Sequence, residues 1–496
     1  MTIAELFNDS FSRRRDAPAL EWAGETLTFG EVDRRANRMA RELLARGFAA
    51  GDRIGVYLAN GPTLVALYLA CTRLGIVYVP VNVLYREREI DHIVADAAPR
   101  AVVATGPVPT NEAVDVLRDD DLAAAAATRD GSPLAGPSLV RDDAAIAALI
   151  YTSGTTGPAK GAMLTQANLA ANARALCESW RFTSDDRLLL ALPLFHVHGL
   201  GNGLHCWLAS GCRLRLLERF DHARAAREFL ECRPTVFFGV PAMYVRLLDV
   251  EAAAAREIGR TARLFVSGSA PLPAAVFEAF RERFGHAILE RYGMTETLMT
   301  IGNPYAGERR PGTVGLPLPG TRASIRDEDG REVPEGVTGE LHVRGATVCA
   351  GYWRRAEATS AAFTADGFFR TGDLAARAPD GYITLQGRRS DLIISGGFNI
   401  YPREIEELLL EQPGVAEAAV VGVPDGVRGE VPVAFVVPAA GAAPGDIGAL
   451  AEVCRASLAS FKVPRAFVPV DGLPRTALGK VQKHLLPPWP GTSRQG

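Results

Sequence analysis

The stretch Tyr151-Thr-Ser-Gly-Thr-Thr-Gly-Pro-Ala-Lys-Gly161 follows the apolar run Ala147–Ile150 and precedes a helical pattern. Its three glycines allow the backbone to turn tightly and to bring N–H groups close to an anion. Lys160 adds a compact positive charge, and four hydroxyl side chains add hydrogen-bond donors: Thr152, Ser153, Thr155 and Thr156. The stretch therefore predicts a polyphosphate-binding loop. It differs from the P-loop pattern because a glycine follows the lysine and the glycine spacing is different.

Strand-like apolar runs alternate with amphipathic helical patterns on both sides of this loop. The expected strands are Arg53–Leu58, Ala101–Ala104, Ala147–Thr152, Leu188–Leu192, Val236–Gly239 and Leu264–Ser267. Helices are expected at Glu31–Ala45 and Leu272–Phe284, and Thr28, three residues before Glu31, fits a capping box. The alternation is typical of an α/β fold with largely parallel sheets.

The pattern of the sequence changes after about residue 310. Short strands with Gly and Pro turns then predict a small β subdomain, at Thr313–Leu316, Arg322–Asp327 and Gly339–Val343. A compact α+β unit follows, with helices at Pro402–Leu410 and Asp446–Ser460 and strands at Ala416–Val423, Val431–Val437 and Ala466–Val470. We place the boundary at Arg389–Asp391, which gives an N-terminal domain over residues 1–389 and a C-terminal domain over residues 390–496.

The composition is that of a globular protein with a large core: 496 residues, 48% hydrophobic and 22% charged. A net charge of −3 gives no basic excess for binding a polynucleotide. Seven scattered cysteines without a C-x-x-C pair argue against a disulfide framework and a zinc site. The N-terminus has no apolar leader, and Gly61–Pro80 is typical of a core helix and a buried strand rather than a membrane span. We therefore expect a cytoplasmic protein without stable membrane insertion.

Only four of the 54 basic residues are lysines: Lys160, Lys462, Lys480 and Lys483. A lysine retained against such a bias is expected where a compact ammonium is needed and a planar guanidinium fails. The surroundings favour this interpretation for Lys160 and Lys480, whereas Lys462 and Lys483 fit an ordinary surface position equally well.

The loop resembles the phosphate-binding signature of the adenylate-forming superfamily, which includes acyl-CoA synthetases, adenylation domains of peptide synthetases and luciferases. Four further motifs follow in that family's order: Arg291-Tyr-Gly-Met-Thr-Glu296, Thr371-Gly-Asp373, Gly387-Arg-Arg-Ser-Asp391 with Gly396–Gly397, and Pro474-Arg-Thr-Ala-Leu-Gly-Lys480. The resemblance covers nearly the whole chain. It implies an acid–thiol ligase that makes an acyl-adenylate and pyrophosphate from ATP and a carboxylate. The acyl group then passes to coenzyme A with release of AMP.

The resemblance implies that residues of several motifs hold ATP. In the loop these are Thr152, Ser153, Gly154, Thr155, Thr156, Gly157 and Lys160. Asp373 and Arg388 would contact the ribose. Tyr292, followed by Gly293, would stack on the adenine.

Further residues would contact the phosphates and the acyl group. Thr295 would touch the α-phosphate, and Glu296 would hold Mg²⁺, because a hard cation prefers carboxylate oxygen. A polar turn would line the adenine and acyl sites, through Ser267, Ser269 and Ala270.

In the family the lysine at the position of Lys480 enters the active site and neutralises the α-phosphate as the carboxylate attacks. The C-terminal domain would then rotate and present Gly396, Gly397 and Phe398 to the thiol of coenzyme A. The family hinge position, commonly Asp or Lys, is Ser390 in this sequence, which leaves the energetics of the rotation open.

Two features predict a short dicarboxylic acid as substrate. Arg291 precedes Tyr292 at the expected floor of the acyl site, where an unpaired charge would be costly beside a fatty-acyl tail. A second substrate carboxylate would pair with it, unless Arg291 points away and pairs with Glu290. His196, in Leu192-Pro-Leu-Phe-His-Val-His-Gly199, would line the path between the acyl and CoA sites, and His198 is expected to be structural.

These two segments together look specifically like malonyl-CoA synthetases. Met243, in Val240-Pro-Ala-Met-Tyr244, would supply another wall of the acyl site. Malonate and methylmalonate stay undistinguished, because one methyl group is worth only ~1–3 kcal/mol.

Three rival readings remain. The acid could be a medium-chain or aromatic monocarboxylic acid. The acceptor could be a carrier protein acting in trans, although no carrier domain follows Lys480 in this sequence. The chain could also be a degenerate ATP-binding sensor. The presence of every motif residue argues against this interpretation.

Overall fold

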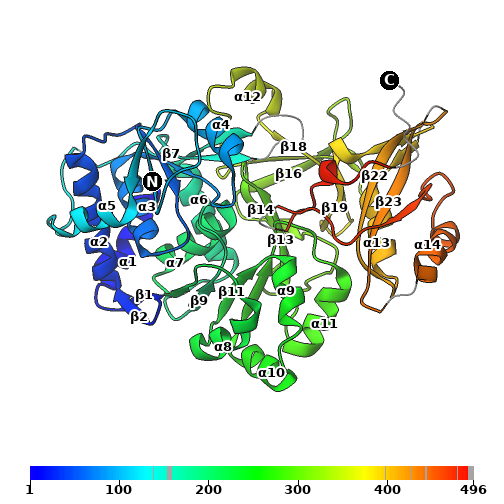
Figure 1. Ribbon diagram of the computed structural model, residues 1–496, viewed down its shortest axis with the longest axis horizontal. Coiled ribbons are helices and arrows are strands. Elements are labelled where there is room, and N and C mark those ends of the chain that lie inside the picture. Colours follow the sequence, from blue (N-terminus) through cyan, green and yellow to red (C-terminus); the bar gives the residue numbers. More distant parts are fainter. Residues whose placement is uncertain are drawn as a thin grey trace.

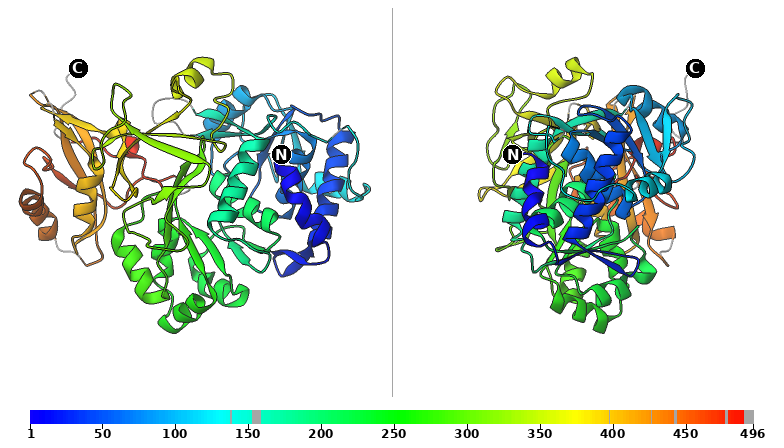
Figure 2. Two further views of the ribbon diagram at one scale, coloured as in Figure 1. Left: turned by 180° about the vertical axis from the view of Figure 1, so that it is seen from behind. Right: turned by 90° about the vertical axis from the view of Figure 1, so that its left-hand side faces the viewer.

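The computed structural model describes residues 1–137, 139–152, 159–396, 398–425, 427–441, 444–476 and 479–489, with the backbone alone at 444–448. Two large sheets, a small antiparallel sheet and a C-terminal sheet make up the described chain. Figure 1 shows the C-terminal elements at the far end of the molecule from the N-terminal helices, and Figure 2 shows the same arrangement from behind and from the side.

The first large sheet has the strand order β6-β5-β3-β4-β7-β8. Its strands are β3 (Arg53–Tyr57), β4 (Val77–Pro80), β5 (Ala101–Ala104), β6 (Asp115–Arg118), β7 (Ile146–Thr152) and β8 (Lys160–Thr165). All neighbours are parallel except β7 and β8, which form an antiparallel hairpin. The polyphosphate loop is therefore the connection of a hairpin.

The second large sheet has the order β15-β14-β13-β12-β11-β9-β10-β1-β2. Its strands are β1 (Pro18–Trp22), β2 (Glu25–Thr28), β9 (Arg187–Leu190), β10 (Arg213–Leu216), β11 (Val236–Gly239), β12 (Leu264–Ser267), β13 (Leu289–Met294), β14 (Leu298–Gly302) and β15 (Leu316–Pro317). The central strands from β1 to β13 are parallel, and antiparallel strands close both edges.

Helices cover these sheets and lie between them. They are α1 (Ile3–Arg13), α2 (Phe29–Ala45), α3 (Pro62–Leu74), α4 (Glu87–Ala97), α5 (Asp119–Ala127), α6 (Gln166–Ser179), the π-helix η1 (His198–Leu204), α7 (His205–Ser210), α8 (His222–Cys232), α9 (Pro241–Leu247), α10 (Ala252–Thr261) and α11 (Ala274–Phe284). Helix α6 contacts β8 of one sheet and β14 of the other, so it lies between them. Helix α3 is apolar on all sides, and this predicts full burial, which the structure confirms for most of its residues.

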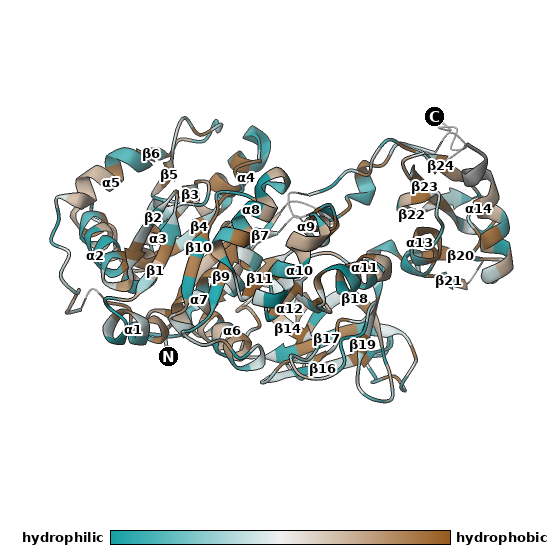
Figure 3. Ribbon diagram, turned by 90° about the horizontal axis from the view of Figure 1, so that it is seen from below, coloured by the Kyte–Doolittle hydropathy of each residue, from teal (hydrophilic) through white to brown (hydrophobic). Residues whose placement is uncertain are grey.

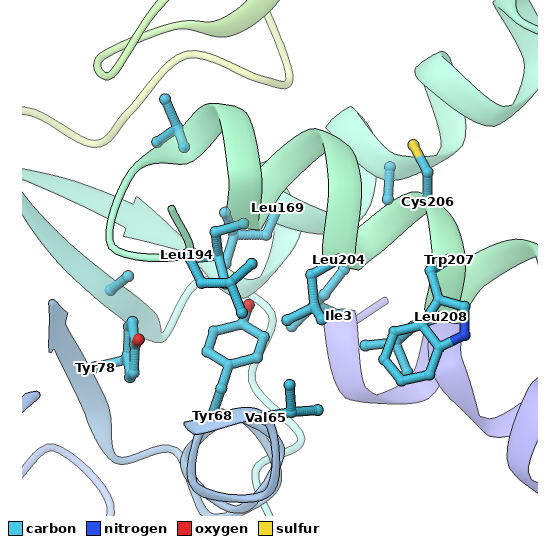
Figure 4. Packing of buried hydrophobic residues seen from close by; sticks show 14 of the residues in the cluster. Ile3, Val65, Tyr68, Tyr78, Leu169, Leu194, Leu204, Cys206, Trp207 and Leu208 are labelled. Atoms are coloured by element: carbon cyan, nitrogen blue, oxygen red, sulfur yellow. The ribbon is translucent and has the colours of Figure 1, made fainter. Parts of the chain in front are cut away.

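The main core forms where these central helices meet. Figure 4 shows Tyr68 and Val65 of α3 packed toward Leu204 of η1, Ile3 of α1 and the α7 residues, including Trp207. A buried hydrogen bond of 2.6 Å joins Tyr68 Oη and the His205 ring. Figure 3 shows apolar colour on the strands between helices that carry polar residues on their outer faces.

The small antiparallel sheet follows, with helix α12 (Ala356–Ala362) beside it. Its strands, in spatial order, are β16 (Thr321–Arg326), β17 (Gly339–Gly345), β18 (Phe369–Arg377) and β19 (Ile383–Arg388). Strands β18 and β19 pair so that Asp373 and Arg388 are direct partners. The pairing brings two of the predicted motifs together.

The C-terminal part begins after a single turn of 3-10 helix, η2 (Arg389–Asp391). Its elements are β20 (Ile393–Ser395), β21 (Phe398–Ile400), α13 (Pro402–Leu410), β22 (Val415–Asp425), β23 (Gly429–Pro438), α14 (Pro444–Ser457), β24 (Phe467–Pro469) and the 3-10 helix η3 (Lys483–Leu485). The structure places η2 at the expected domain boundary, while the domain limits at residues 389 and 390 stay a prediction.

The α/β fold class and most of the expected elements are confirmed. The capping box of Thr28 and Glu31 is present at the start of α2. Two expectations were wrong. A strand, β8, and not a helix, follows the polyphosphate loop, because the chain at Gly161–Thr165 pairs back onto β7. The segment Thr313–Leu316 contributes only Leu316 to a strand, and that strand joins the second large sheet rather than the small one.

Within the described ranges, no helix combines the length and apolar character needed to cross a lipid bilayer.

Candidate active site

The base of the polyphosphate loop is fixed by the β7–β8 hairpin. Thr152 and Lys160 are paired residues at its open end. The Lys160 ammonium lies 5.3 Å from the centroid of the Tyr352 ring. Five predicted loop residues lie outside the described residues: Ser153, Gly154, Thr155, Thr156 and Gly157.

Glu296 lies in the turn between β13 and β14, buried beside Thr295. The Tyr352 hydroxyl donates a hydrogen bond of 3.0 Å to Glu296 Oε1. Burial raises the pKa of Glu296, and the bond from Tyr352 opposes that shift. Tyr352 thus joins the predicted metal-binding carboxylate to Lys160. Sequence reasoning missed Tyr352, whose only signal is an aromatic residue after a glycine, Gly351.

Asp373, Tyr292 and Arg388 form one buried group. The Tyr292 hydroxyl donates a hydrogen bond of 2.5 Å to Asp373 Oδ2, and Arg388 Nε lies 2.8 Å from Asp373 Oδ1. Arg388 also donates to the Thr371 carbonyl at 3.0 Å. Burial raises the pKa of Asp373, and the Arg388 charge opposes this shift. The residues predicted for the adenine and the ribose are therefore in direct contact.

Lys480 of the C-terminal part shares the electrostatic surroundings of this group. Partial burial lowers the pKa of Lys480, and the charge of Arg388 lowers it further. The carboxylates of Asp373, Asp391 and Glu296 act in the opposite direction. Lys480 keeps contact with solvent. An ammonium from the end of the chain thus faces the carboxylates predicted to bind ATP.

The other two lysines, Lys462 and Lys483, are held in ion pairs of the C-terminal part. Lys462 lies 2.7 Å from Glu404, and Lys483 lies 2.7 Å from Glu406. Both pairs are structural contacts within one domain.

Arg291 is buried on β13, with only 3% of its surface exposed. Its Nε and Nη2 atoms have no hydrogen-bond partner among the described residues. The guanidinium packs against Gly268, where an added Cβ would lie 2.4 Å from Arg291 Cζ. Burial lowers the pKa of Arg291 to about 9. The site therefore holds a cation whose hydrogen-bonding capacity is not used by the described protein.

The alternative pairing of Arg291 with Glu290 is not observed. Successive side chains of a strand point to opposite faces, so neighbours on β13 diverge. Glu290 instead accepts a hydrogen bond of 3.1 Å from the backbone N–H of Leu272. Burial raises the pKa of Glu290 to about 7. The carboxylate next in sequence therefore does not neutralise the guanidinium.

His196 and His198 lie within the electrostatic field of Arg291. Burial lowers the pKa of His196 to about 3, and the Arg291 charge adds to the shift. The same causes lower the pKa of His198. Both imidazoles are thus neutral at physiological pH, and Arg291 is left as the cation of this group.

The turn after β12 completes the group. A hydrogen bond of 3.0 Å joins His198 Nδ1 and the hydroxyl oxygen of Ser269. Ser269 has a positive φ of 74°, a conformation uncommon for a non-glycine residue. The Ser267 hydroxyl is buried and has no partner in the described chain. His198, which we expect to be structural, therefore bonds to the turn predicted to line the acyl site.

Met243 on α9 is partly buried and packs against the apolar clusters on both sides of the second sheet. Phe398, predicted to serve the CoA step, is 54% exposed and stacks on Phe461 of the same domain at 4.5 Å. Gly396 precedes it with a positive φ of 57°, and Gly397 lies outside the described residues. The structure thus brings Lys480, and not Phe398, to the Asp373 group.

A cavity of about 260 Å³ opens elsewhere, at the ends of β9, β10 and β11 beside α8. Of the predicted site residues that the structure describes, none lines it.

Comparison with known proteins gives two matches to sequence families. The AMP-binding enzyme family matches residues 7–353, and the AMP-binding enzyme C-terminal domain matches residues 404–480. The sulfoacetate–CoA ligase of Cupriavidus necator is 38% identical, over 97% of this chain and 96% of that protein. The malonate–CoA ligase of Arabidopsis thaliana is 33% identical, over 98% of this chain and 88% of that protein. A long-chain-fatty-acid–CoA ligase of Bacillus subtilis is 32% identical, over 98% and 94%.

Among solved structures, MatB from Rhodopseudomonas palustris is 41% identical over 98% of both chains. The TM-score is 0.90 against its ATP-bound crystal structure and 0.81 against its apo crystal structure. The arrangement described above is therefore more similar to the ATP-bound form.

Proposed function

Because the chain belongs to the AMP-binding enzyme family and is an ATP-dependent acid–CoA ligase, we propose that its acid is a short dicarboxylate, malonate or methylmalonate. The observation that carries this proposal is the buried guanidinium of Arg291, whose Nε and Nη2 atoms have no hydrogen-bond partner among the described residues. An uncompensated buried charge costs several kcal/mol, so a ligand that supplies the opposite charge gains that energy on binding. The relative that acts on malonate supports the same choice.

The chemistry of recognition follows from the planar guanidinium. A carboxylate can accept two parallel hydrogen bonds from such a group, which gives both energy and orientation. The neutral imidazoles of His196 and His198 add polar groups without a competing positive charge. A monocarboxylic acid with an apolar tail would leave Arg291 buried and unpaired. The site would therefore favour an acid that is charged at both ends.

The first step joins the reacting carboxylate of the acid to the α-phosphorus of ATP, and pyrophosphate leaves. Tyr292 and Gly293 would place the adenine, and Asp373 with Arg388 would place the ribose. The hydroxyls and backbone of the loop from Thr152 to Lys160 would hold the β- and γ-phosphates. Thr295 would contact the α-phosphate, and Lys480 would offset the negative charge that develops there.

The residues present fit a magnesium ion held by the phosphates and one carboxylate. Mg²⁺ keeps several waters and typically uses one or two carboxylates in addition to substrate phosphates. Glu296 offers such a carboxylate, oriented by Tyr352 and set beside Lys160. When bound, the ion would neutralise phosphate charge, and Glu296 is the residue we expect to hold it.

The second step replaces AMP by coenzyme A. Its thiolate attacks the acyl carbon, and AMP leaves with the bonding electron pair. A rotation at Ser390 would move Lys480 away and bring Gly396, Gly397 and Phe398 to the site, while His196 would line the path of the thiol. Ser269 and Ala270 would remain at the acyl-adenylate throughout.

Sulfoacetate is a second candidate, favoured by the 38% identical relative. It has the size of malonate, with a sulfonate in place of one carboxylate. Arg291 can pair with either group, because both are anions with several acceptor oxygens. The two candidates share the requirement for a second negative charge.

A substrate panel tests the proposal directly. Malonate, methylmalonate, sulfoacetate, acetate, octanoate and benzoate would be compared by pyrophosphate release with free coenzyme A. We expect malonate or methylmalonate to give the highest kcat/KM. A higher value for sulfoacetate would select the second candidate. A higher value for octanoate or benzoate would contradict the dicarboxylate proposal, and thioester formation only on an added carrier protein would contradict the acceptor.

The substitution Arg291→Leu tests whether Arg291 pairs with the second carboxylate of the substrate. We expect malonate kcat/KM to fall by about 100-fold or more, since losing one partner of a buried pair costs ~3–5 kcal/mol. Acetate should change little. Arg281→Leu is the matched control, because Arg281 is an exposed arginine on α11 that pairs with Glu278. Full malonate activity in Arg291→Leu would overturn the assignment.

A further inference from the structure

The hairpin that carries Lys480 is held by apolar packing and a backbone hydrogen bond at its base, and by another backbone hydrogen bond at Lys480 itself. At the base, Leu473 and Val481 pack on the C-terminal core, and the backbone N–H of Gln482 donates to the Pro474 carbonyl at 2.8 Å. At the tip, the Thr476 backbone N–H donates to the Lys480 carbonyl at 2.8 Å. Gly479 has a φ of +81°, which an L side chain rarely adopts.

Arg475 connects the backbone next to Lys480 to strand β22 of the C-terminal sheet. Its Nη1 donates a hydrogen bond of 2.5 Å to the carbonyl of Gly479, the residue directly before Lys480. Its Nη2 lies 2.8 Å from Glu417 Oε2 on β22. Arg475 also pairs with Val481 through an antiparallel bridge. One guanidinium therefore ties the backbone at the lysine to a carboxylate of the rigid sheet.

The orientation of Lys480 depends on that backbone. A lysine has four flexible side-chain bonds, so its ammonium reaches a fixed point only when its Cα is held in place. A displacement of about 1 Å at a reacting group can cost about 100-fold in rate. The planar guanidinium of Arg475 bonds to a carbonyl and a carboxylate at once and so restrains the backbone, which a single ammonium cannot do as well.

We propose that Arg475, anchored by Glu417, is a positioning residue that holds the Lys480 hairpin in place for the adenylation step. The proposal rests on the proposed role of Lys480. Arg475 acts through the hairpin backbone, and it contributes nothing to the transfer of the acyl group to coenzyme A.

The two half-reactions separate this role from a structural one. Adenylation is measured as exchange of radiolabelled pyrophosphate into ATP with the best acid of the panel. Transfer is measured from the chemically prepared acyl-adenylate of that acid and coenzyme A. We expect Arg475→Gln to slow adenylation by 10- to 100-fold and to leave transfer within twofold. Equal losses in both half-reactions would show general damage to the domain and would overturn the proposal.

Graded variants test the geometry. Glu417→Gln keeps the bond to the Gly479 carbonyl and removes only the ionic anchor, so we expect a smaller loss, of about three- to tenfold. Arg475→Lys can keep one of the two contacts and should recover part of the rate. Arg455→Gln is the matched control, because it breaks an exposed Arg–Glu pair on α14 with Glu452 and should change neither step. An Arg475→Gln rate equal to that of this control would overturn the proposal.

The decisive comparison uses Lys480→Ala. If Arg475 acts only through the lysine, then Arg475→Gln causes no further loss of adenylation in the Lys480→Ala background. A further loss of tenfold or more would show that Arg475 acts by another route. If Lys480→Ala itself leaves adenylation unchanged, the role of the lysine in the proposed function fails, and the positioning role fails with it. If Lys480→Ala is slow and Arg475→Gln is not, only the positioning role fails.

Discussion

Arg291 is the residue on which the proposed preference for a dicarboxylic acid rests, and its burial makes its charge sensitive to pH. Sequence reasoning identified Arg291 as a candidate because a guanidinium is out of place beside an apolar acyl chain. It could not decide between a substrate partner and Glu290. The alternation of side chains along β13 decides that question, and alternation has meaning only once the strand is placed in the sheet.

The preference for malonate over acetate should weaken at high pH. Burial lowers the pKa of Arg291 to about 9, so the free enzyme carries the cation at pH 7 and loses it as the pH rises through 9. Only the cation can pair with the second carboxylate. We expect the ratio of kcat/KM for malonate to that for acetate to fall by about tenfold for each pH unit above 9.

The pKa of Lys480 is also lowered, but the proposed role of Lys480 is the same for both acids, so its titration cancels in the ratio. Arg291→Leu should show a ratio that does not change with pH. A ratio that stays constant between pH 7 and pH 10 in the unsubstituted enzyme would contradict the role of Arg291.

At the scale of elements, strands set by local periodicity were predicted well and strands set by distant contacts were not. The expected bounds of β5, β11 and β12 match the structure, because each is a short apolar run between turn residues. Strand β8 escaped prediction although one of its edges pairs locally with β7, because its other edge bonds to a segment nearly 200 residues away. The backbone N–H of Met163 donates to Gly351 and that of Trp353 donates to Gly161. No local pattern encodes such contacts.

The close contact of α10 and α11 gives a prediction for stability. A Cβ added at Gly259 would lie 1.9 Å from the carbonyl oxygen of Phe284, which is backbone and cannot move aside cheaply. Overpacking typically costs ~1–3 kcal/mol, while alanine gains up to ~1 kcal/mol of helix propensity over glycine. We expect Gly259→Ala to destabilise the protein by about 1–2 kcal/mol, measured as a lower thermal unfolding midpoint.

Gly106→Ala is the matched control. A Cβ at Gly106 meets no atom within 4 Å, and the unfolding midpoint should stay unchanged. A stabilised Gly259→Ala variant would show that helix propensity outweighs the contact.

At the scale of the whole molecule, we propose that two faces of the C-terminal part serve the two steps. The face with Lys480 lies near Asp373 in this structure, and the overall arrangement is more similar to the ATP-bound form of MatB than to its apo form. Sequence motifs predict which residues lie on each face. They could not predict which face meets the N-terminal part, because that depends on how the chain on either side of residues 389–391 is oriented.

The face that carries Phe398 is the one that we expect to serve acyl transfer to coenzyme A. Phe461 stacks on Phe398 and holds it in place. Aromatic stacking is worth ~0.5–1.5 kcal/mol, so we expect Phe461→Ala to slow acyl transfer to coenzyme A by about three- to tenfold. Pyrophosphate exchange should stay within twofold. Phe461→Tyr keeps the ring and should restore transfer, whereas a variant that loses exchange and keeps transfer would reverse the assignment of the two faces.

The buried guanidinium also bears on how acid preference evolves within such a chain. Exchanging an unpaired interior charge for a leucine relieves a penalty and can raise the free energy of unfolding by about 1–4 kcal/mol. A change from a dianion-selective ligase to one for apolar acids therefore stabilises the protein. The reverse path must first introduce a destabilising residue into the interior. Ancestors of a dianion-selective ligase would thus have needed a reserve of stability before they could acquire Arg291.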